Sequence, residues 1–270
     1  MDIPLGKPTP APERYDPGVL APMARAAGRR GMGLDEAWPF AGEDLWRGYE
    51  FSWLSQRGMP QVALVELRVS ARSPNIVESK SMKLYFNSFA QTRFDSEQVV
   101  AECLRADLQS AFGAPVAVTL KDLEAAAEAS LLPGASLDSL DIDVDTYERA
   151  PHLLSVVSGG SALAETVYTH RFRSLCPVTG QPDWASLLIR YQGPALDHAG
   201  LLRYLVSFRC HQAFHETTVE QIFLDLKSHG HCERLLVAGY FLRRGGVDIN
   251  PVRGDPGMVE DWPVLRLARQ

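Results

Sequence analysis

The sequence predicts an α+β fold in which antiparallel β-sheets are backed by helices, and three observations carry this prediction. Apolar-rich runs come in adjacent pairs joined by short turn-forming segments, which is typical of β-hairpins. Each pair is followed by stretches with helical apolar spacing and a capping signal. The arrangement occurs twice in 270 residues, so we expect two similar modules rather than one continuous sheet.

In the first half, a hairpin is predicted over 46–55 and 61–70. A helix is predicted from Asp95 to about Phe112, because Asp95 and Gln98 have the spacing of a capping box. Its expected core face has apolar side chains at helical spacing: Val99, Val100, Cys103, Leu104 and Leu108. A short strand is predicted over 116–121. The segment 123–132 is ambiguous, and 137–144 could be a strand edge or a loop.

In the second half, strands are predicted over 165–173 and 184–191, again as a hairpin. A short helix or extended helix entry is predicted over 201–208. A further helix opens near His215 and runs to about His229, with Thr217 and Glu220 as its capping box. Strands are then predicted over 235–243 and 264–267.

The two halves align with each other as a degenerate repeat. The segment 60–68 matches 182–190, and Ser88-Phe89 matches Ser207-Phe208. We therefore divide the chain into an N-terminal arm of mostly irregular structure (1–44), a first module (45–145) and a second module (146–270).

The informative feature of the repeat is what each copy lacks. In our alignment Leu54 stands where the second copy has Cys176, and Gln61 stands where it has Asp183. Conversely, Glu78-Ser79-Lys80 has no counterpart near 197–199, and His215-Glu216 matches Asp95-Ser96. This division predicts one composite site to which both modules contribute.

Composition excludes several classes of protein. A net charge of −6 and a sequence pI near 5.7 lack the basic surplus of a dedicated nucleic-acid binder. No apolar stretch reaches the roughly 18 residues of a membrane helix, and the first residues lack the apolar core of a signal peptide. The four cysteines form no C-x-x-C pair and no secreted-type disulfide framework. We therefore expect a cytoplasmic protein with reduced thiols.

The segment 174–184 gathers the most chemistry in the chain. Cys176 lies in a loop rich in proline and glycine, and Asp183 follows seven residues later, where a strand begins. A thiolate is a strong carbon nucleophile, and a carboxyl group that keeps its proton can act as an acid. A buried structural cysteine beside a turn aspartate would give the same pattern, so the pair alone leaves both readings open.

Metal binding is the main competing chemistry. Cys210, His211, His215 and the 229–232 segment have metal-like spacing, and zinc enzymes are a real alternative. No C-x-x-C or His-x-Glu pattern completes a closed ligand set, so we expect no metal. The glycine-rich segment 28–33 lacks a preceding strand and the G-x-G-x-x-G spacing, which makes it a weak nucleotide loop.

Three motifs together resemble a known family. The segments 78–85, 176–183 and 215–216 are similar to those of the NADPH-dependent 7-cyano-7-deazaguanine reductases of queuosine biosynthesis, a pathway of tRNA modification. Their order along the chain resembles the two-module subfamily, and the similarity extends from about Trp46 to the C-terminus. The resemblance implies two tandem tunnelling-fold (T-fold) modules and a nitrile reductase that uses two NADPH and no metal.

The resemblance also implies residue roles. Cys176 would be the nucleophile that forms a covalent thioimide, and Asp183 would be the proton donor. Substrate contacts would come from the motif residues Val77, Glu78, Ser79, His215 and Glu216. NADPH contacts would come from Ser79, Lys80, Arg244 and Gly245.

The residue types suit this chemistry independently. Thiolate addition to the nitrile carbon with protonation of nitrogen gives the thioimide. Asp183 must keep its proton near neutrality to serve as the acid, so we expect burial or the thiolate to raise the pKa of Asp183. A 7-deazaguanine offers a ring N–H beside an amino group, which fits one bidentate carboxylate, and we assign this contact to Glu216. Lys80 and Arg244 are cations suited to phosphates, and Gly245 lets backbone N–H groups approach closely.

Other functions stay open at this point. A cysteine-dependent nitrile hydrolase would form the same thioimide and then add water, and a zinc-dependent T-fold cyclohydrolase would act on a purine or pterin. A non-catalytic base-binding module would need no Cys–Asp pair. Because the sheet edges of T-fold modules must pair or close, we expect at least a homodimer, with no direct nucleic-acid or membrane partner.

Overall fold

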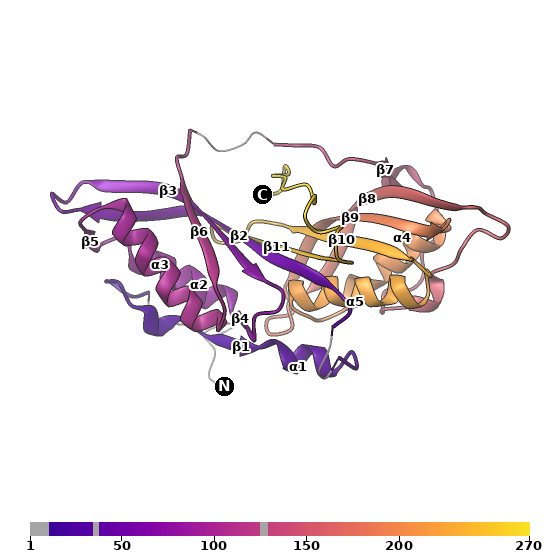
Figure 1. Cartoon of the computed structure of the whole chain (residues 1–270), viewed down its shortest axis with the longest axis horizontal. Helices are drawn as coiled ribbons and strands as arrows, with labels where there is room; N and C mark the ends of the chain where they lie inside the picture. Colours follow the sequence, from indigo (N-terminus) through magenta and orange to yellow (C-terminus); the bar gives the residue numbers. More distant parts are fainter. Residues whose placement is uncertain (1–10, 35–37, 125–128) are drawn as a thin grey trace. The chain divides into compact units, whose positions relative to one another are not determined.

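The computed structural model describes residues 11–34, 38–124 and 129–270. Two compact units result, shown in the colours of the sequence in Figure 1. The first comprises Met1–Asp35, Glu43–Glu128 and Arg243–Ile249, and the second comprises Glu36–Gly42, Ala129–Leu242 and Asn250–Gln270. The expected modules are continuous stretches, whereas each unit is assembled from three stretches.

In the first unit, β2 (Ala41–Ser55) and β3 (Pro60–Ser70) form the predicted antiparallel hairpin. The strand β6 (Val116–Lys121) pairs with β3, as the apolar run over 116–121 predicts. Two helices, α2 (Ser79–Ser88) and α3 (Glu97–Phe112), pack against the hairpin through a shared apolar core (Figure 1). Short strands complete the unit: β1 (Pro22–Ala24), β4 (Asn75–Val77) and β5 (Arg93–Phe94).

The helix α3 has the predicted length but a different cap. Ser96 precedes it, and the Ser96 hydroxyl accepts a hydrogen bond from the Val99 N–H, so the predicted capping box at Asp95 is wrong. The predicted core face is otherwise confirmed. Val100, Leu104 and Leu108 are buried, whereas Val99 and Cys103 are partly buried against the same core.

The segment before residue 44 is more regular than predicted. A 3₁₀ turn covers Pro17–Val19, a short helix α1 covers Arg25–Arg30, and β1 pairs with β4. Arg25 is buried and forms an ion pair of 2.5 Å with the buried Asp44. Burying both charges together avoids the cost of either one alone, so this pairing fixes the segment on its unit.

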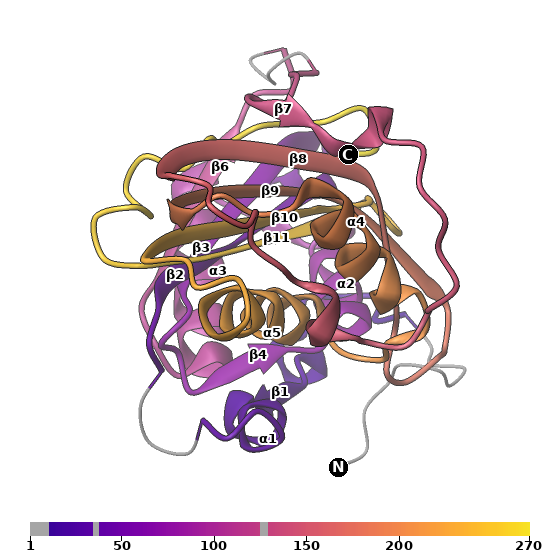
Figure 2. The same cartoon turned by 90° about the vertical axis from the view of Figure 1, so that its right-hand side faces the viewer.

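In the second unit, β8 (Ala162–Leu175) and β9 (Pro182–Pro194) form the second predicted hairpin, and β10 (Arg234–Phe241) extends it antiparallel. The helices α4 (His198–Ser207) and α5 (His215–Ser228) lie on one face of these strands (Figure 2). The predicted strands over 165–173, 184–191 and 235–243 are confirmed. The remaining elements are short: β7 (Ala135–Ser136), 3₁₀ turns over Leu137–Ser139, Pro151–Leu153 and Phe208–Cys210.

Two predictions in this half are wrong, and one strand was not predicted. The helix α5 begins at His215 with Phe214 as its cap residue, so Thr217 and Glu220 form no capping box. The segment 264–267 is not a strand. The strand β11 (Val247–Gly254) is absent from the prediction, because Asn250 and Pro251 interrupt its apolar pattern. Of the two ambiguous segments, 137–144 is a 3₁₀ turn followed by loop, and 123–132 lies partly outside the described residues.

The repeat extends to hydrogen bonds inside each unit. Tyr85 in α2 donates its hydroxyl to Asp107 in α3 at 2.6 Å. Tyr204 in α4 donates to Asp225 in α5 at 2.7 Å. A phenol–carboxylate bond, partly buried in the first copy and buried in the second, therefore joins the two helices at the same place in both copies, which confirms the two-module organisation of the fold.

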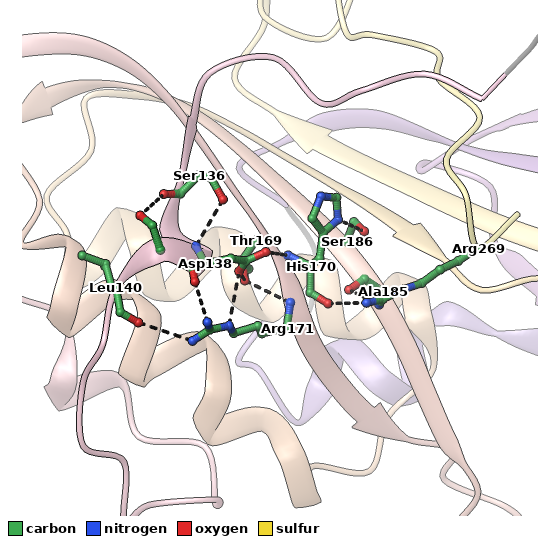
Figure 3. Close-up of polar contacts among 10 residues, drawn as sticks. Ser136, Asp138, Leu140, Thr169, His170, Arg171, Ala185, Ser186 and Arg269 are labelled. Carbon is green, nitrogen blue, oxygen red and sulfur yellow. Dashed lines mark hydrogen bonds and ion pairs between the residues drawn. The ribbon is translucent and has the colours of Figure 1, made fainter.

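The segment before β8 is fixed to a β-bulge in that strand (Figure 3). The Asp138 carboxylate accepts hydrogen bonds from the Thr169 hydroxyl and the His170 N–H. From the C-terminal segment, Arg269 donates to the His170 carbonyl, and the His170 ring contacts the Ser186 hydroxyl. These bonds fix the bulge of β8 to the segment before it and to the C-terminal segment. Within the described residues, no helix combines the length and apolar character required to span a membrane.

Candidate active site

Cys176 is held by backbone hydrogen bonds on both sides of its loop. Its N–H donates to the Gln181 carbonyl at 2.9 Å, and its carbonyl accepts from the Gly180 N–H at 3.0 Å. Gly180 has a φ of +66°, a conformation that favours glycine and closes the loop. The preceding Leu175 is bonded to residues 211 and 213. The Cys176 side chain is 8% exposed, so the loop holds a buried thiol in one position.

Asp183 is the second residue of β9 and lies beside the start of α5. Its Oδ2 is 3.4 Å from the Nε2 of His215, and both side chains are largely buried. The His215 ring stacks on Phe241 with a centroid distance of 3.9 Å and an interplanar angle of 11°. The stacking fixes the plane of the imidazole beside Asp183.

Glu216 occupies the first turn of α5 and is 4% exposed. A carboxylate at the N-terminus of a helix is stabilised by the exposed N–H groups and by the helix dipole. Four of the predicted site residues are therefore in the second unit, at the end of the β8–β9 hairpin and the start of α5: Cys176, Asp183, His215 and Glu216.

The other predicted site residues are in the first unit. Val77 ends β4, and Glu78, Ser79 and Lys80 form the start of α2. The Glu78 carboxylate accepts hydrogen bonds from the N–H groups of Lys80 at 2.5 Å and Ser81 at 2.9 Å. Glu78 is thus the cap of α2. The sequence analysis missed this role because it predicted no helix over 79–88, and because glutamate is not among the usual cap residues.

Arg244 and Gly245 lie in the tight turn that precedes β11. Gly245 and Gly246 have φ values of +57° and +76°, and Arg244 and Val247 exchange two backbone hydrogen bonds. A Cβ placed on Gly245 would be 3.1 Å from the Lys83 Cδ, so the turn packs against α2 one helical turn after Lys80. The same unit therefore brings together the candidate NADPH residues Ser79, Lys80, Arg244 and Gly245, and adds Lys83, which the sequence analysis missed.

These first-unit residues fit a dinucleotide that carries phosphates. Lys80 and Arg244 are partly exposed cations, and the turn presents backbone at its two glycines. By contrast, the described residues include no group of three or more His, Cys, Asp or Glu side chains arranged to hold a metal ion. Burial and the nearby Arg149 lower the pKa of His211, one of the histidines with metal-like spacing.

The register of the strands corrects our alignment of the two copies. Leu54 pairs with Pro60, and Leu175 pairs with Pro182, so Leu54 corresponds to Leu175. The residue that corresponds to Cys176 is therefore Ser55, not Leu54. The starts of α3 and α5 likewise match His215-Glu216 with Glu97-Gln98, not with Asp95-Ser96. Gln61 remains the counterpart of Asp183.

Comparisons with known proteins show the family of this chain. The family described as "Nitrile reductase, 7-cyano-7-deazaguanine-reductase N-term" matches residues 11–120, and the family described as "QueF-like protein" matches residues 182–256. An NADPH-dependent 7-cyano-7-deazaguanine reductase from Chromohalobacter salexigens is 51% identical over 269 residues, which cover 99% of this chain and 96% of the relative.

Enzymes of the same name from two Burkholderia species are equally similar. The B. orbicola protein is 50% identical over 254 residues, and the B. multivorans protein is 50% identical over 252 residues; each match covers 93% of this chain and 92% of the relative. The chain belongs to the family of NADPH-dependent 7-cyano-7-deazaguanine reductases. Family membership confirms the resemblance and the two tandem T-fold modules, and it favours neither a nitrile hydrolase nor a zinc cyclohydrolase.

Proposed function

We propose that this protein reduces the nitrile of 7-cyano-7-deazaguanine to the aminomethyl group of 7-aminomethyl-7-deazaguanine, with two NADPH, as a step of queuosine biosynthesis. Two findings support this function: family membership over nearly the whole chain, and the contact of buried Asp183, in the hairpin that holds Cys176, with the largely buried side chain of His215 at the start of α5. The second is the observation from the structure on which the mechanism depends.

The Cys176 thiolate attacks the nitrile carbon. A sulfur–carbon bond forms as one carbon–nitrogen π bond breaks, and the nitrogen takes the proton of Asp183. The products of this step are a neutral thioimide and the Asp183 carboxylate. Because His215 Nε2 is 3.4 Å from Asp183 Oδ2, the imidazole can return a proton to Asp183 for the later steps.

The base is oriented by carboxylates. Glu216, in the first turn of α5, accepts hydrogen bonds from the ring N–H and the amino group of the substrate. His215 contributes from the same turn, and Val77, Glu78 and Ser79 contribute further contacts. NADPH supplies hydride when bound, and Ser79, Lys80, Arg244 and Gly245 would hold it through its phosphates and ribose.

We also propose that the enzyme works in the cytoplasm as a homo-oligomer, at least a dimer. The four free cysteines of the described chain are consistent with a reducing compartment. Light scattering during size-exclusion chromatography measures the mass of the assembly; a mass near 30 kDa, that of one chain, would contradict the oligomer.

Product analysis tests the function. Incubation of the purified protein with 7-cyano-7-deazaguanine and NADPH should yield the primary amine and consume two NADPH for each nitrile. A carboxylic acid with release of ammonia, and no NADPH oxidation, would instead show a nitrile hydrolase.

A further inference from the structure

Ser174 is a buried hydroxyl in β8 with no role in the mechanism above. Its exposed fraction is 0%, and its Oγ has no hydrogen-bond partner among the described residues. A buried hydroxyl without a partner destabilises a fold, whereas alanine at the same place would remove that cost. The retention of a polar group here needs another reason.

The register of the sheet places Ser174 opposite the proposed acid. Ser174 and Asp183 are directly opposite each other on β8 and β9. The Cβ atoms of such a pair lie roughly 4.5–5.5 Å apart on the same face of the sheet. Cys176 follows two residues later, at the start of the loop directly after β8.

The first unit shows what this position holds when there is no nucleophile. Trp53 pairs with Gln61 as Ser174 pairs with Asp183, so Trp53 is the counterpart of Ser174. Trp53 is 4% exposed and contacts Phe51 with a ring distance of 5.8 Å. The copy without Cys and Asp fills the position with a large apolar ring; the copy with them has a small hydroxyl.

We propose that Ser174 is a positioning residue for proton delivery: its hydroxyl donates a hydrogen bond to the Asp183 carboxylate that forms when the nitrile nitrogen takes the proton. This inference rests on the proposed thioimide mechanism and adds a residue to it. In that step Asp183 goes from a neutral acid to a buried anion, so a donor that meets the new charge lowers the barrier. The small side chain of Ser174 also leaves space beside the carboxyl group of Asp183.

Each of the other titratable groups in this region either favours or disfavours the anionic form of Asp183. His215 from α5 faces its Oδ2 and favours the anion when protonated. The thiolate of Cys176, from the loop after β8, disfavours the anion, and so does a charged Glu216 in the first turn of α5. Ser174 adds a neutral donor whose contribution does not depend on pH in the working range. Its loss therefore shifts the titration of Asp183 upward without adding a new titrating group.

The isosteric pair Ser174→Thr and Ser174→Val separates the hydroxyl from the volume, since these variants differ only in the hydroxyl group and a methyl group of similar size. The readout is the rate of thioimide formation with 7-cyano-7-deazaguanine in the absence of NADPH, followed by mass spectrometry of quenched samples across pH. We expect Ser174→Thr to keep most of the native rate. Ser174→Val should form the thioimide roughly ten- to a hundredfold more slowly, as expected for loss of a hydrogen bond to a charged group. Its alkaline limit should move to higher pH, while the dissociation constant of the substrate stays unchanged.

Two further variants control for failure to fold and for the loss of a buried hydroxyl elsewhere in the sheet. Ser174→Ala adds no atom and gives the same comparison if the branched side chains prevent folding. Ser186→Ala, the matched control, removes a buried hydroxyl from the opposite face of β9, where it contacts His170, and should leave the rate and the alkaline limit in place.

Equal rates and equal alkaline limits for Ser174→Thr, Ser174→Val and Ser174→Ala would overturn the inference. The proposed function fails in a different way: the native protein itself would then form no thioimide.

Discussion

At the scale of single residues, the thiol of Cys176 is positioned by the backbone of its loop and by no side-chain hydrogen bond that the structure records. Removing the sulfur should therefore leave the loop in place. We expect Cys176→Ala and Cys176→Ser to abolish turnover while the melting temperature stays near that of the native protein. NADPH oxidation and thermal unfolding measure the two effects. Cys210→Ala, which removes an exposed thiol, is the matched control and should be fully active. Normal NADPH oxidation by Cys176→Ala would refute the covalent mechanism.

The carboxyl group of Asp183 acts as an acid in this account, so activity requires its protonated form. As the pH rises through the pKa of Asp183, the acid is lost and the rate of thioimide formation should fall. Asp183→Asn keeps the size of the side chain but has no acidic proton to deliver. We expect this variant to bind the nitrile, to form thioimide slowly and to lack the alkaline limb of the native pH profile. Unchanged turnover with an unchanged profile would mean that Asp183 is structural.

At the scale of elements, the repeat offers a matched pair of helix caps. Glu78 caps α2, and Asp197 caps α4 by accepting hydrogen bonds from the N–H groups of Ala199 and Gly200. Loss of either cap should reduce the free energy of unfolding by about 0.5–2 kcal/mol. Only Glu78 is also assigned to the substrate, so a shared loss of stability can be separated from a specific loss of binding.

We therefore expect Glu78→Ala and Asp197→Ala to be destabilised alike in denaturant unfolding. Glu78→Ala alone should lose affinity for the nitrile, roughly ten- to a hundredfold for one charge-assisted hydrogen bond. Titration of each variant with substrate measures the difference. Native affinity in Glu78→Ala would leave Glu78 with the capping role only.

The elements also show what the sequence could and could not predict. The two hairpins were predictable because apolar runs flank short polar turns, and strand formation follows that pattern closely. The cap of α5 was not, because Thr217 and Glu220 have the spacing of a capping box, while Phe214 caps the helix with no side-chain bond. The predicted helix start near His215 is confirmed, and it places His215 and Glu216 inside the first helical turn.

The candidate site was predictable only in part. Its residues were found through three motifs, and the structure groups them as four in one unit and six in the other. The second role of Glu78 and the place of Ser174 opposite Asp183 depend on strand register and helix start, which local patterns fix poorly. The one-residue error that matched Cys176 with Leu54 has the same cause.

At the scale of the whole molecule, each unit draws on stretches that are distant in the chain. Residues 243–249 belong to the first unit and residues 36–42 to the second. A cut between residues 145 and 146 therefore gives two fragments that each lack part of a unit. Fragments 1–145 and 146–270 should each be inactive when expressed alone, and mixing them should restore part of the activity. Full activity in the isolated second fragment would show that the first unit serves only as a scaffold.

The mass of the intact chain tests the central claim most directly, because the claim is a covalent bond between Cys176 and the nitrile carbon. Incubation with 7-cyano-7-deazaguanine without NADPH should add the full mass of the substrate once, since the addition releases no atom. Peptide mapping should place the adduct on Cys176 and not on Cys232, because burial raises the pKa of the Cys232 thiol to about 12. The adduct should disappear when NADPH is added. An unmodified chain that still reduces the nitrile, or an adduct on another cysteine, would contradict the account.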